Sequence, residues 1–328
     1  MMQMKPEKRL STDTERCIHC GKCRDSCSFL SEHGLDIGNR ERLGELAYHC
    51  FLTGKCTEVC PSGIDGRQAV LEMRQQLVSE GKADMSPYRM LLAEKRDYIF
   101  RNYRHARAES VLFPGCNFPS MYPETLKKLY ALLRDRAGMG IAYDCCGKPV
   151  AELGLKKDEE RIIEDIDKRL CERGVREVVV LCPNCWYFLK DRLDLRVISI
   201  YEKLSELGLG EKIDTSAKVF VPCPDRCGRE LIRQIQDSFA DGMLSVHEDA
   251  GCCGLGGSAA ALEPELAASM TSMIPKDEKL SVYCASCAGK LTRDGIRNVS
   301  HVLTEILGTY EKPDTGKSFL NRAVTKLK

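Results

Sequence analysis

A pattern of five cysteines occurs twice in this chain, and this repeat constrains the fold more than any other feature. The first copy comprises Cys116, Cys145, Cys146, Cys182 and Cys185, and the second comprises Cys223, Cys252, Cys253, Cys284 and Cys287. Matching cysteines lie 107 residues apart at the first three positions and 102 residues apart at the last two. Such a regular offset predicts two copies of one domain. Consecutive cysteines form an ordinary disulfide only with strain, so the two CCG phrases need another explanation.

Eight short apolar runs alternate with helical patterns from residue 110 onward. Three runs in each copy lead into cysteine, as VLFPGC and REVVVLCPNC do. This alternation predicts α/β domains with small, mostly parallel sheets, in which ligands collect at the carboxyl ends of the strands. We predict one such domain over 110–210 and a second over 211–308. Residues 309–328, which are basic and poor in apolar side chains, are expected to form a flexible tail.

A denser group of cysteines precedes the repeat. Cys17, Cys20, Cys23 and Cys27 have the spacing C-x2-C-x2-C-x3-C, and a second run holds Cys50, Cys56 and Cys60, followed by proline. Runs of this kind wrap iron–sulfur cubes, and the last cysteine of each run crosses to the other cluster. We therefore predict that a [4Fe-4S] cluster is bound by Cys17, Cys20, Cys23 and Cys60.

The second cluster of this segment is left with three thiolates, from Cys27, Cys50 and Cys56, because Thr53 stands where a cysteine is expected. Three thiolates suit a [3Fe-4S] cluster, or a second [4Fe-4S] cluster with a non-cysteine ligand. The pattern is similar to the helical ferredoxin domain of the succinate dehydrogenase and fumarate reductase iron–sulfur subunits. We expect an α-helical ferredoxin-type domain over 1–81 and a helical linker over 82–109.

The composition narrows the class of protein. Lys and Arg number 49 against 48 Asp and Glu, a balance that argues against a nucleic-acid partner. No apolar run approaches the roughly eighteen residues of a membrane span, and MMQMKPEKRL has no apolar core for a signal peptide. We expect a cytoplasmic protein with no membrane span of its own. Nineteen cysteines in such a compartment favour thiolate ligation of metal over disulfides.

The repeated pattern consists of one cysteine, then CCG, then CxxC. It resembles the CCG domains found in the B-type subunits of heterodisulfide reductases. The preceding cysteine runs look like the C-type subunits, so residues 10–308 are similar to the fused D-type, in which both parts form one chain. The resemblance implies that each five-cysteine set binds a non-cubane [4Fe-4S] cluster with one bridging cysteine. It also implies that the two clusters face each other and take the two sulfurs of a disulfide, which makes all ten cysteines a cluster-borne catalytic site.

Two functions fit this resemblance. The first is the catalytic iron–sulfur subunit of a heterodisulfide-reductase-like complex, which reduces a disulfide or oxidises two thiols. The alternative is an electron-transfer subunit of a flavin-dependent dehydrogenase of the glycolate, lactate, glycerol-3-phosphate or thiol:fumarate type, without its own substrate. GLGGSA at 254–259 directly follows two cysteines and is a weak dinucleotide fingerprint. Electrons are therefore expected from a flavoprotein or from a membrane cytochrome, which would hold the chain at the inner face of the membrane.

Several residues have less specific interpretations. Cys171 and Cys227 lack counterparts in the other copy. We expect Cys171 to be a small buried residue of a helix and Cys227 to be a spare thiol. For His19, His49 and His247 we expect packing or surface roles.

Two further patterns lie at the repeated cysteines themselves. The CPNC and CASC pairs also fit a zinc site or thioredoxin-like redox pairs, but neither explains the adjacent cysteines. Lys148, Asp225 and Arg226 follow the cysteines closely in sequence and are candidates for lining a substrate pocket.

Overall fold

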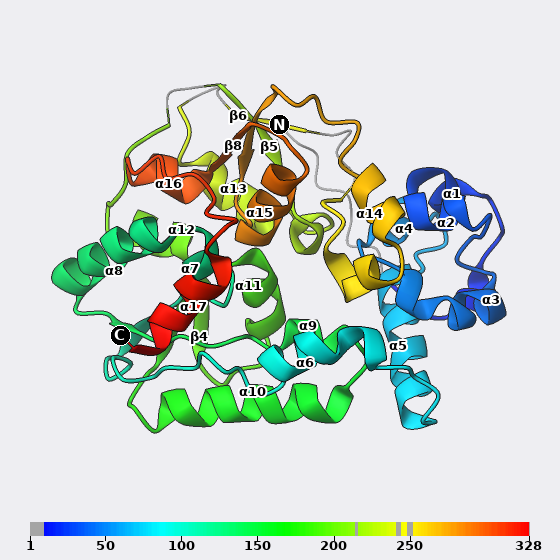
Figure 1. Ribbon diagram of the computed structural model, residues 1–328, viewed down its shortest axis with the longest axis horizontal. Coiled ribbons are helices and arrows are strands. Elements are labelled where there is room, and N and C mark those ends of the chain that lie inside the picture. Colours follow the sequence, from blue (N-terminus) through cyan, green and yellow to red (C-terminus); the bar gives the residue numbers. More distant parts are fainter. Residues whose placement is uncertain (1–9, 214–215, 241–243, 248–251, 328) are drawn as a thin grey trace.

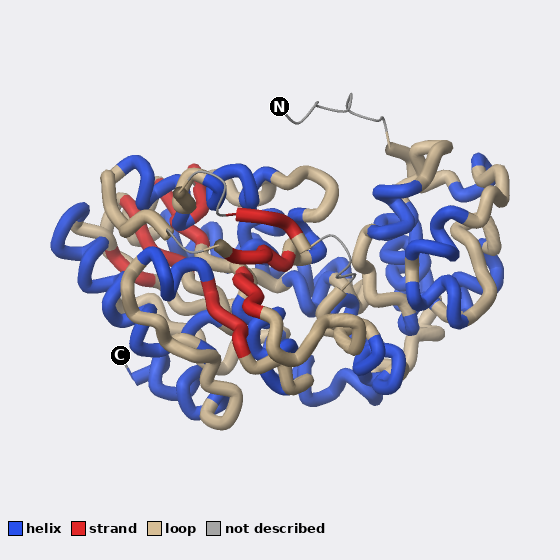
Figure 2. Tube along the Cα trace, turned by 90° about the horizontal axis from the view of Figure 1, so that it is seen from above, coloured by secondary structure: helices blue, strands red, loops and turns tan. Residues whose placement is uncertain are grey.

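The computed structural model describes residues 10–213, 216–240, 244–247 and 252–327. A helical N-terminal lobe lies to one side of two α/β halves (Figures 1 and 2). Residues 1–9 of the predicted ferredoxin-type domain and Lys328 of the predicted tail lie outside the described residues. Within the described ranges, no helix has the length and apolar composition needed to cross a bilayer.

Short helices build the N-terminal lobe and the segment that leaves it. They are η1 (Thr14–Arg16), α1 (Lys22–Ser26), α2 (Ser28–Glu32), α3 (Arg40–Glu45), η2 (Ala47–His49), α4 (Lys55–Val59), α5 (Gly66–Ser79), η3 (Ser86–Tyr88) and α6 (Arg89–Lys95). The phrase GKC begins both α1 and α4, and its glycine is left-handed in each, with φ of 74° at Gly21 and 76° at Gly54. The two helices pack against each other and bring the two cysteine runs together.

The first α/β half contains four parallel strands in the order β2-β1-β3-β4. Its elements are β1 (Ser110–Phe113), α7 (Phe118–Met121), α8 (Pro123–Ala137), β2 (Gly140–Ile141), α9 (Lys148–Ala151), α10 (Lys156–Cys171), β3 (Glu177–Val180), α11 (Pro183–Leu189), β4 (Arg196–Ser199) and α12 (Ile200–Glu206). Strand β3 is buried along its whole length, as expected for a central strand covered on both faces. Val111 of β1 pairs with Val178 of β3.

The second half has the equivalent strand order, β6-β5-β7-β8, and all its pairs are parallel. Its elements are β5 (Ala217–Phe220), η4 (Cys223–Asp225), α13 (Glu230–Gln236), β6 (Leu244–Val246), η5 (Gly256–Ala261), α14 (Pro264–Ser269), β7 (Lys279–Val282), α15 (Ala285–Arg293), β8 (Asn298–His301) and α16 (Val302–Ile306). Every apolar run singled out in the sequence contains one of the eight strands. The predicted mixed α/β fold is therefore confirmed.

The prediction of a flexible C-terminal tail is wrong for the described part of that segment. Residues Ser318–Leu327 form α17, which packs against α7 (Figure 1). Asn321 Nδ2 donates to the carbonyl of Ser120 at 3.1 Å, and Asn102 Nδ2 donates to the carbonyl of Thr325 at 2.8 Å. These bonds span about two hundred residues of sequence, so local composition could not reveal them.

The prediction that Cys171 is buried is also wrong, because this side chain is exposed. The apolar face of α10 is made by Ile162, Ile166 and Leu170, which are spaced by four residues. Cys171 is the next residue after that row and points about 100° away from it. Cys227 is exposed as well.

Arg74 of α5 joins the lobe to both α/β halves. Its fully buried guanidinium donates to the carbonyls of Ala47 at 2.9 Å and Cys50 at 2.7 Å in the lobe. It also donates to Glu152 of the first half at 2.6 Å and to Gly257 of the second at 2.8 Å. Hydrogen bonds from a charged donor are among the stronger ones in proteins. A single side chain therefore ties three parts of the chain together.

We predict that Arg74→Met lowers the free energy of unfolding by at least about 3 kcal/mol, because it leaves four buried carbonyls without their charged donor. Arg74→Lys should recover only part of the loss, since an ammonium lacks the planar fork. Denaturant unfolding of the anaerobically purified protein measures the effect. The control is Arg89→Met at an exposed position. Equal stability of the Arg74 and Arg89 variants would contradict the assignment.

Candidate metal centres

Four cysteines of the N-terminal lobe line one small cavity. They are Cys17, Cys20, Cys23 and Cys60. The first three belong to the run around α1 and the last directly follows α4, so the packing of these two helices carries Cys60 across to the first run. This is the grouping predicted from the crossover of two-cluster domains. Their role as ligands of one [4Fe-4S] cluster stays a prediction.

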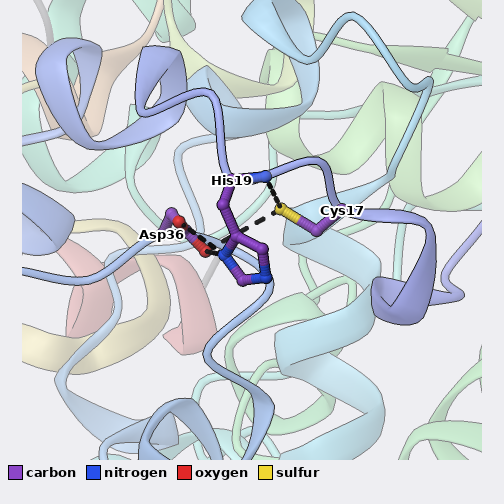
Figure 3. Close-up of side chains that lie close together, drawn as sticks. All are labelled: Cys17, His19 and Asp36. Atoms are coloured by element: carbon purple, nitrogen blue, oxygen red, sulfur yellow. Dashed lines mark hydrogen bonds and ion pairs between the residues drawn. The ribbon is translucent and has the colours of Figure 1, made fainter.

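Hydrogen bonds surround the sulfur of Cys17 (Figure 3). The backbone N–H of His19 donates to Cys17 Sγ at 3.4 Å, and Asp36 Oδ1 lies 3.8 Å from the same sulfur. Asp36 also accepts a hydrogen bond from His19 Nδ1 at 3.0 Å. Burial raises the pKa of the Cys17 thiol, and the negative Asp36 raises it further. A thiolate here needs a compensating positive charge, which a metal supplies.

A second cavity, of about 220 Å³, is lined by Cys27, Cys50 and Cys56. Burial and the neighbouring Cys27 raise the pKa of Cys50 to about 11. Thr53 lines the same cavity, and its hydroxyl accepts a hydrogen bond from the backbone N–H of Lys55 at 3.3 Å. The three thiols predicted to share the second cluster thus lie together, with a threonine beside them.

This second cavity reaches the second five-cysteine set, because Cys252 is also among its lining residues. Arg226 lies between the two groups and donates a hydrogen bond to Cys223. Burial raises the pKa of Cys27, and the positive charge of Arg226 offsets part of this rise. The lobe and the second α/β half therefore meet through cysteines and one buried arginine. The sequence placed Arg226 near the cysteines of its own set, but not near those of the lobe.

The five thiols of the first set lie in one line, each beside the next. Their order along the line is Cys116, Cys145, Cys146, Cys185 and Cys182. Each follows the carboxyl end of β1, β2 or β3, the edge predicted from the parallel sheet. Cys146 is central, and hydrogen bonds from both of its neighbours lower its pKa.

The second set repeats this order with Cys223, Cys252, Cys253, Cys287 and Cys284. The sulfurs of Cys223 and Cys252 are 3.5 Å apart. Cys253 takes the central place, and hydrogen bonds from Cys252 and Cys287 lower its pKa. The second cysteine of each adjacent pair therefore has equivalent thiol neighbours in both halves.

The two lines meet where the thiol of Cys182 lies beside that of Cys284. Ten thiols thus form one continuous line from Cys116 to Cys223. Equivalent cysteines of the two sets lie at equal distances, in number of thiols, from the midpoint. Asn184 Nδ2 lies 3.6 Å from Cys284 Sγ at the midpoint. Buried thiolates this close would repel one another, so the donor set fits soft metals that thiolates bind and that offset their charge.

Glycine follows each adjacent cysteine pair for a reason that the structure shows. Gly147 has φ of 89° and Gly254 has φ of 81°, in the left-handed region that side chains disfavour. A Cβ at Gly254 would also lie 2.5 Å from the carbonyl oxygen of Ala267. Both glycines therefore adopt a backbone conformation that side chains disfavour, and at Gly254 the close neighbour is the protein's own backbone.

Asp225 positions the second set, a role that the sequence did not indicate. Its buried carboxylate accepts hydrogen bonds from the hydroxyls of Tyr187 at 2.5 Å and Tyr283 at 2.6 Å. The backbone N–H groups of Leu231 and Ile232 also donate to it, at 3.0 and 2.9 Å. Tyr187 comes from the first half and Tyr283 directly precedes Cys284, so this carboxylate connects the two halves beside the line of thiols.

Comparison with known proteins identifies two matching domain families. Residues 13–64 match the family described as the 4Fe-4S dicluster domain, and residues 110–190 match the CCG cysteine-rich domain. The first match covers both cysteine runs of the lobe. The second covers the first five-cysteine set.

Three curated relatives extend over most of the chain. One subunit of the fumarate reductase (CoM/CoB) of Methanothermobacter marburgensis is 24% identical over 82% of this chain and 65% of its own length. An uncharacterized iron–sulfur protein of Methanococcus maripaludis is 25% identical over 70% of this chain and 52% of its own length. The chain thus spans between half and two thirds of these two relatives.

The third relative is one subunit of the dihydromethanophenazine:CoB–CoM heterodisulfide reductase of Methanosarcina mazei, of the D-type. It is 23% identical over 83% of this chain and 80% of its own length. Together, the two domain matches and these relatives show that the chain resembles D-type subunits of heterodisulfide reductases.

Proposed function

We propose that this chain is the iron–sulfur subunit of a heterodisulfide-reductase-like complex and that it reduces a disulfide, or oxidises two thiols, at the line of ten cysteines. The observation that carries the proposal is the contact between Cys182 and Cys284, where two complete five-cysteine sets meet. Two sets in contact can serve the two sulfurs of one substrate.

The arrangement of cysteines supports a route for electrons between the lobe and the ten-cysteine site. The Cys17 group and the Cys27 group lie in the lobe, and the cavity of the Cys27 group reaches Cys252. Electrons from a flavoprotein or membrane cytochrome partner would enter the lobe and reach the second set first. The first set, beyond Cys182, is the far end of the route.

The overall reaction takes two electrons and two protons. The disulfide bond breaks, each sulfur gains one electron and one proton, and two thiols leave. Two non-cubane clusters, one held by each set, would supply one electron each. In each set the central thiol, Cys146 or Cys253, is placed between its neighbours and is our candidate for the bridging ligand.

Polar side chains border the midpoint where a substrate would meet both sets. Asn184 Nδ2 approaches Cys284 Sγ at 3.6 Å, and Asn117 Nδ2 donates to Ser286 Oγ at 2.6 Å. Asn184 lies within the CPNC phrase and Ser286 within CASC. We expect these amides and this hydroxyl to orient the substrate by hydrogen bonds.

A second candidate function is supported by the relative that is part of a fumarate reductase (CoM/CoB). In this alternative the chain is an electron-transfer subunit of a flavin-dependent dehydrogenase of the thiol:fumarate, glycolate, lactate or glycerol-3-phosphate type. In the thiol:fumarate case the ten-cysteine site would oxidise thiols. In the other cases it would bind no substrate, and added thiols would leave its paramagnetic signals unchanged.

The first test combines metal content with electron paramagnetic resonance. We predict about fifteen irons per chain, the number required by one three-iron cluster and three four-iron clusters. Adding coenzyme M to the oxidised protein should produce a new paramagnetic signal. Cys253→Ala should lose about four irons and this signal, because it removes the central thiol of one set.

The matched control is Cys227→Ala, at an exposed thiol outside both sets. It should keep the iron and the signal. A full iron content with no response to coenzyme M, to coenzyme B or to their disulfide would favour a pure electron-transfer role. Zinc in place of iron would contradict both functions.

The second test concerns the three-thiolate site. We propose that Cys27, Cys50 and Cys56 hold a [3Fe-4S] cluster, so Thr53→Cys should add one iron per chain and abolish the paramagnetic signal of the oxidised three-iron cluster. Thr53→Ser is the control and should leave both unchanged. An unchanged iron content in Thr53→Cys would instead indicate a four-iron cluster with a non-cysteine ligand.

A further inference from the structure

Two histidines and a glutamate converge where the lobe meets the second α/β half. His33 is the C-cap residue of α2, His49 ends η2, and Glu263 is the N-cap residue of α14. Glu263 Oε1 lies 3.0 Å from His33 Nε2 and 2.7 Å from His49 Nδ1. More than two hundred residues of sequence separate the glutamate from either histidine.

The three side chains present the donor atoms of a zinc site. One imidazole nitrogen from each histidine and a carboxylate oxygen lie within 4.8 Å of one another. Zinc binds such nitrogen and oxygen ligands at about 2.0–2.2 Å, which places ligand atoms about 3.4 Å apart in a tetrahedron. The two distances from Glu263 Oε1 to the histidine nitrogens, 3.0 and 2.7 Å, would each lengthen by a few tenths of an ångström, to about 3.4 Å, to admit the ion.

The surrounding side chains hold the three candidate ligands in place and leave them accessible to solvent. The ring of His33 packs against Phe29, with centroids 5.1 Å apart, and meets the ring of His49 edge-on at 6.0 Å. The side chains of His33, His49 and Glu263 are 23%, 29% and 18% exposed. Water can therefore occupy the fourth position that a three-ligand zinc ion keeps open.

The charge of the glutamate suits a cation. The group is also separate from the cysteine cavities, since none of the three residues is among the described residues that line either cavity of the lobe.

We propose that His33, His49 and Glu263 bind one zinc ion, which clamps the lobe to the second α/β half. His49 directly precedes Cys50, and Glu263 follows Cys253 by ten residues. A metal here fixes the Cys50 segment against the second five-cysteine set. The site does not depend on the disulfide chemistry proposed above.

The test uses the anaerobically purified holoprotein with its iron in place. One equivalent of zinc chloride is added, unbound metal is removed by gel filtration, and zinc is counted by mass spectrometry. We expect one zinc per chain, with an X-ray absorption shell of nitrogen and oxygen at about 2.0–2.2 Å and no sulfur at about 2.3 Å. Glu263→Gln and His33→Ala should each weaken zinc binding by at least about tenfold.

The control is Glu265→Gln, an exposed glutamate two residues further along the chain, which should bind zinc like the wild type. The iron content of each variant reports whether it folds and loads its clusters. A sulfur shell around zinc in the wild-type protein would overturn the proposal, because it would place the ion at cysteines. Unchanged zinc affinity in folded Glu263→Gln would overturn it too, as would absence of bound zinc.

Discussion

The buried guanidinium of Arg74 is the interaction on which the relative position of the lobe and both α/β halves depends. Its four acceptors are backbone carbonyls, at Ala47 and Cys50 in the lobe, Glu152 in the first half and Gly257 in the second. Two of these carbonyls lie at or near cysteines. A planar, permanently charged group with several donors can satisfy carbonyls arriving from different directions at once. The spacing between the cysteine groups therefore rests partly on one side chain.

The line of ten thiols gives the duplicated halves equivalent chemistry but different neighbours. At one end, Cys252 and Arg226 face the lobe and its three-thiolate group. At the other end, Cys145 packs with Tyr98 and Phe100, and Ala323 of α17 packs against this cluster. One end thus faces the lobe, and the other packs against the C-terminal helix. The two sets arise from the duplicated domain. They differ in which other parts of the chain contact them.

Much of the fold followed from local sequence patterns. Each predicted apolar run contains a strand, and each strand pair is parallel, because strand–helix alternation leaves few other connections. The repeated cysteines follow the strand ends, as expected from the position of ligands in such sheets. The grouping of Cys17, Cys20 and Cys23 with Cys60 was predictable as well, because in two-cluster domains the last cysteine of each run crosses to the other cluster.

The sequence by itself determined the residue types, the alternation of strands and helices within each half and the composition of each cysteine group, since these depend on short-range spacing. Only the tertiary structure decided how the groups meet. The contact of Cys182 with Cys284, the hydrogen bonds of Arg74 and the convergence of Glu263 with two histidines join segments far apart in the chain. The packing of α17 is of the same kind. Such contacts depend on how whole elements pack, and no local pattern of residues records that packing.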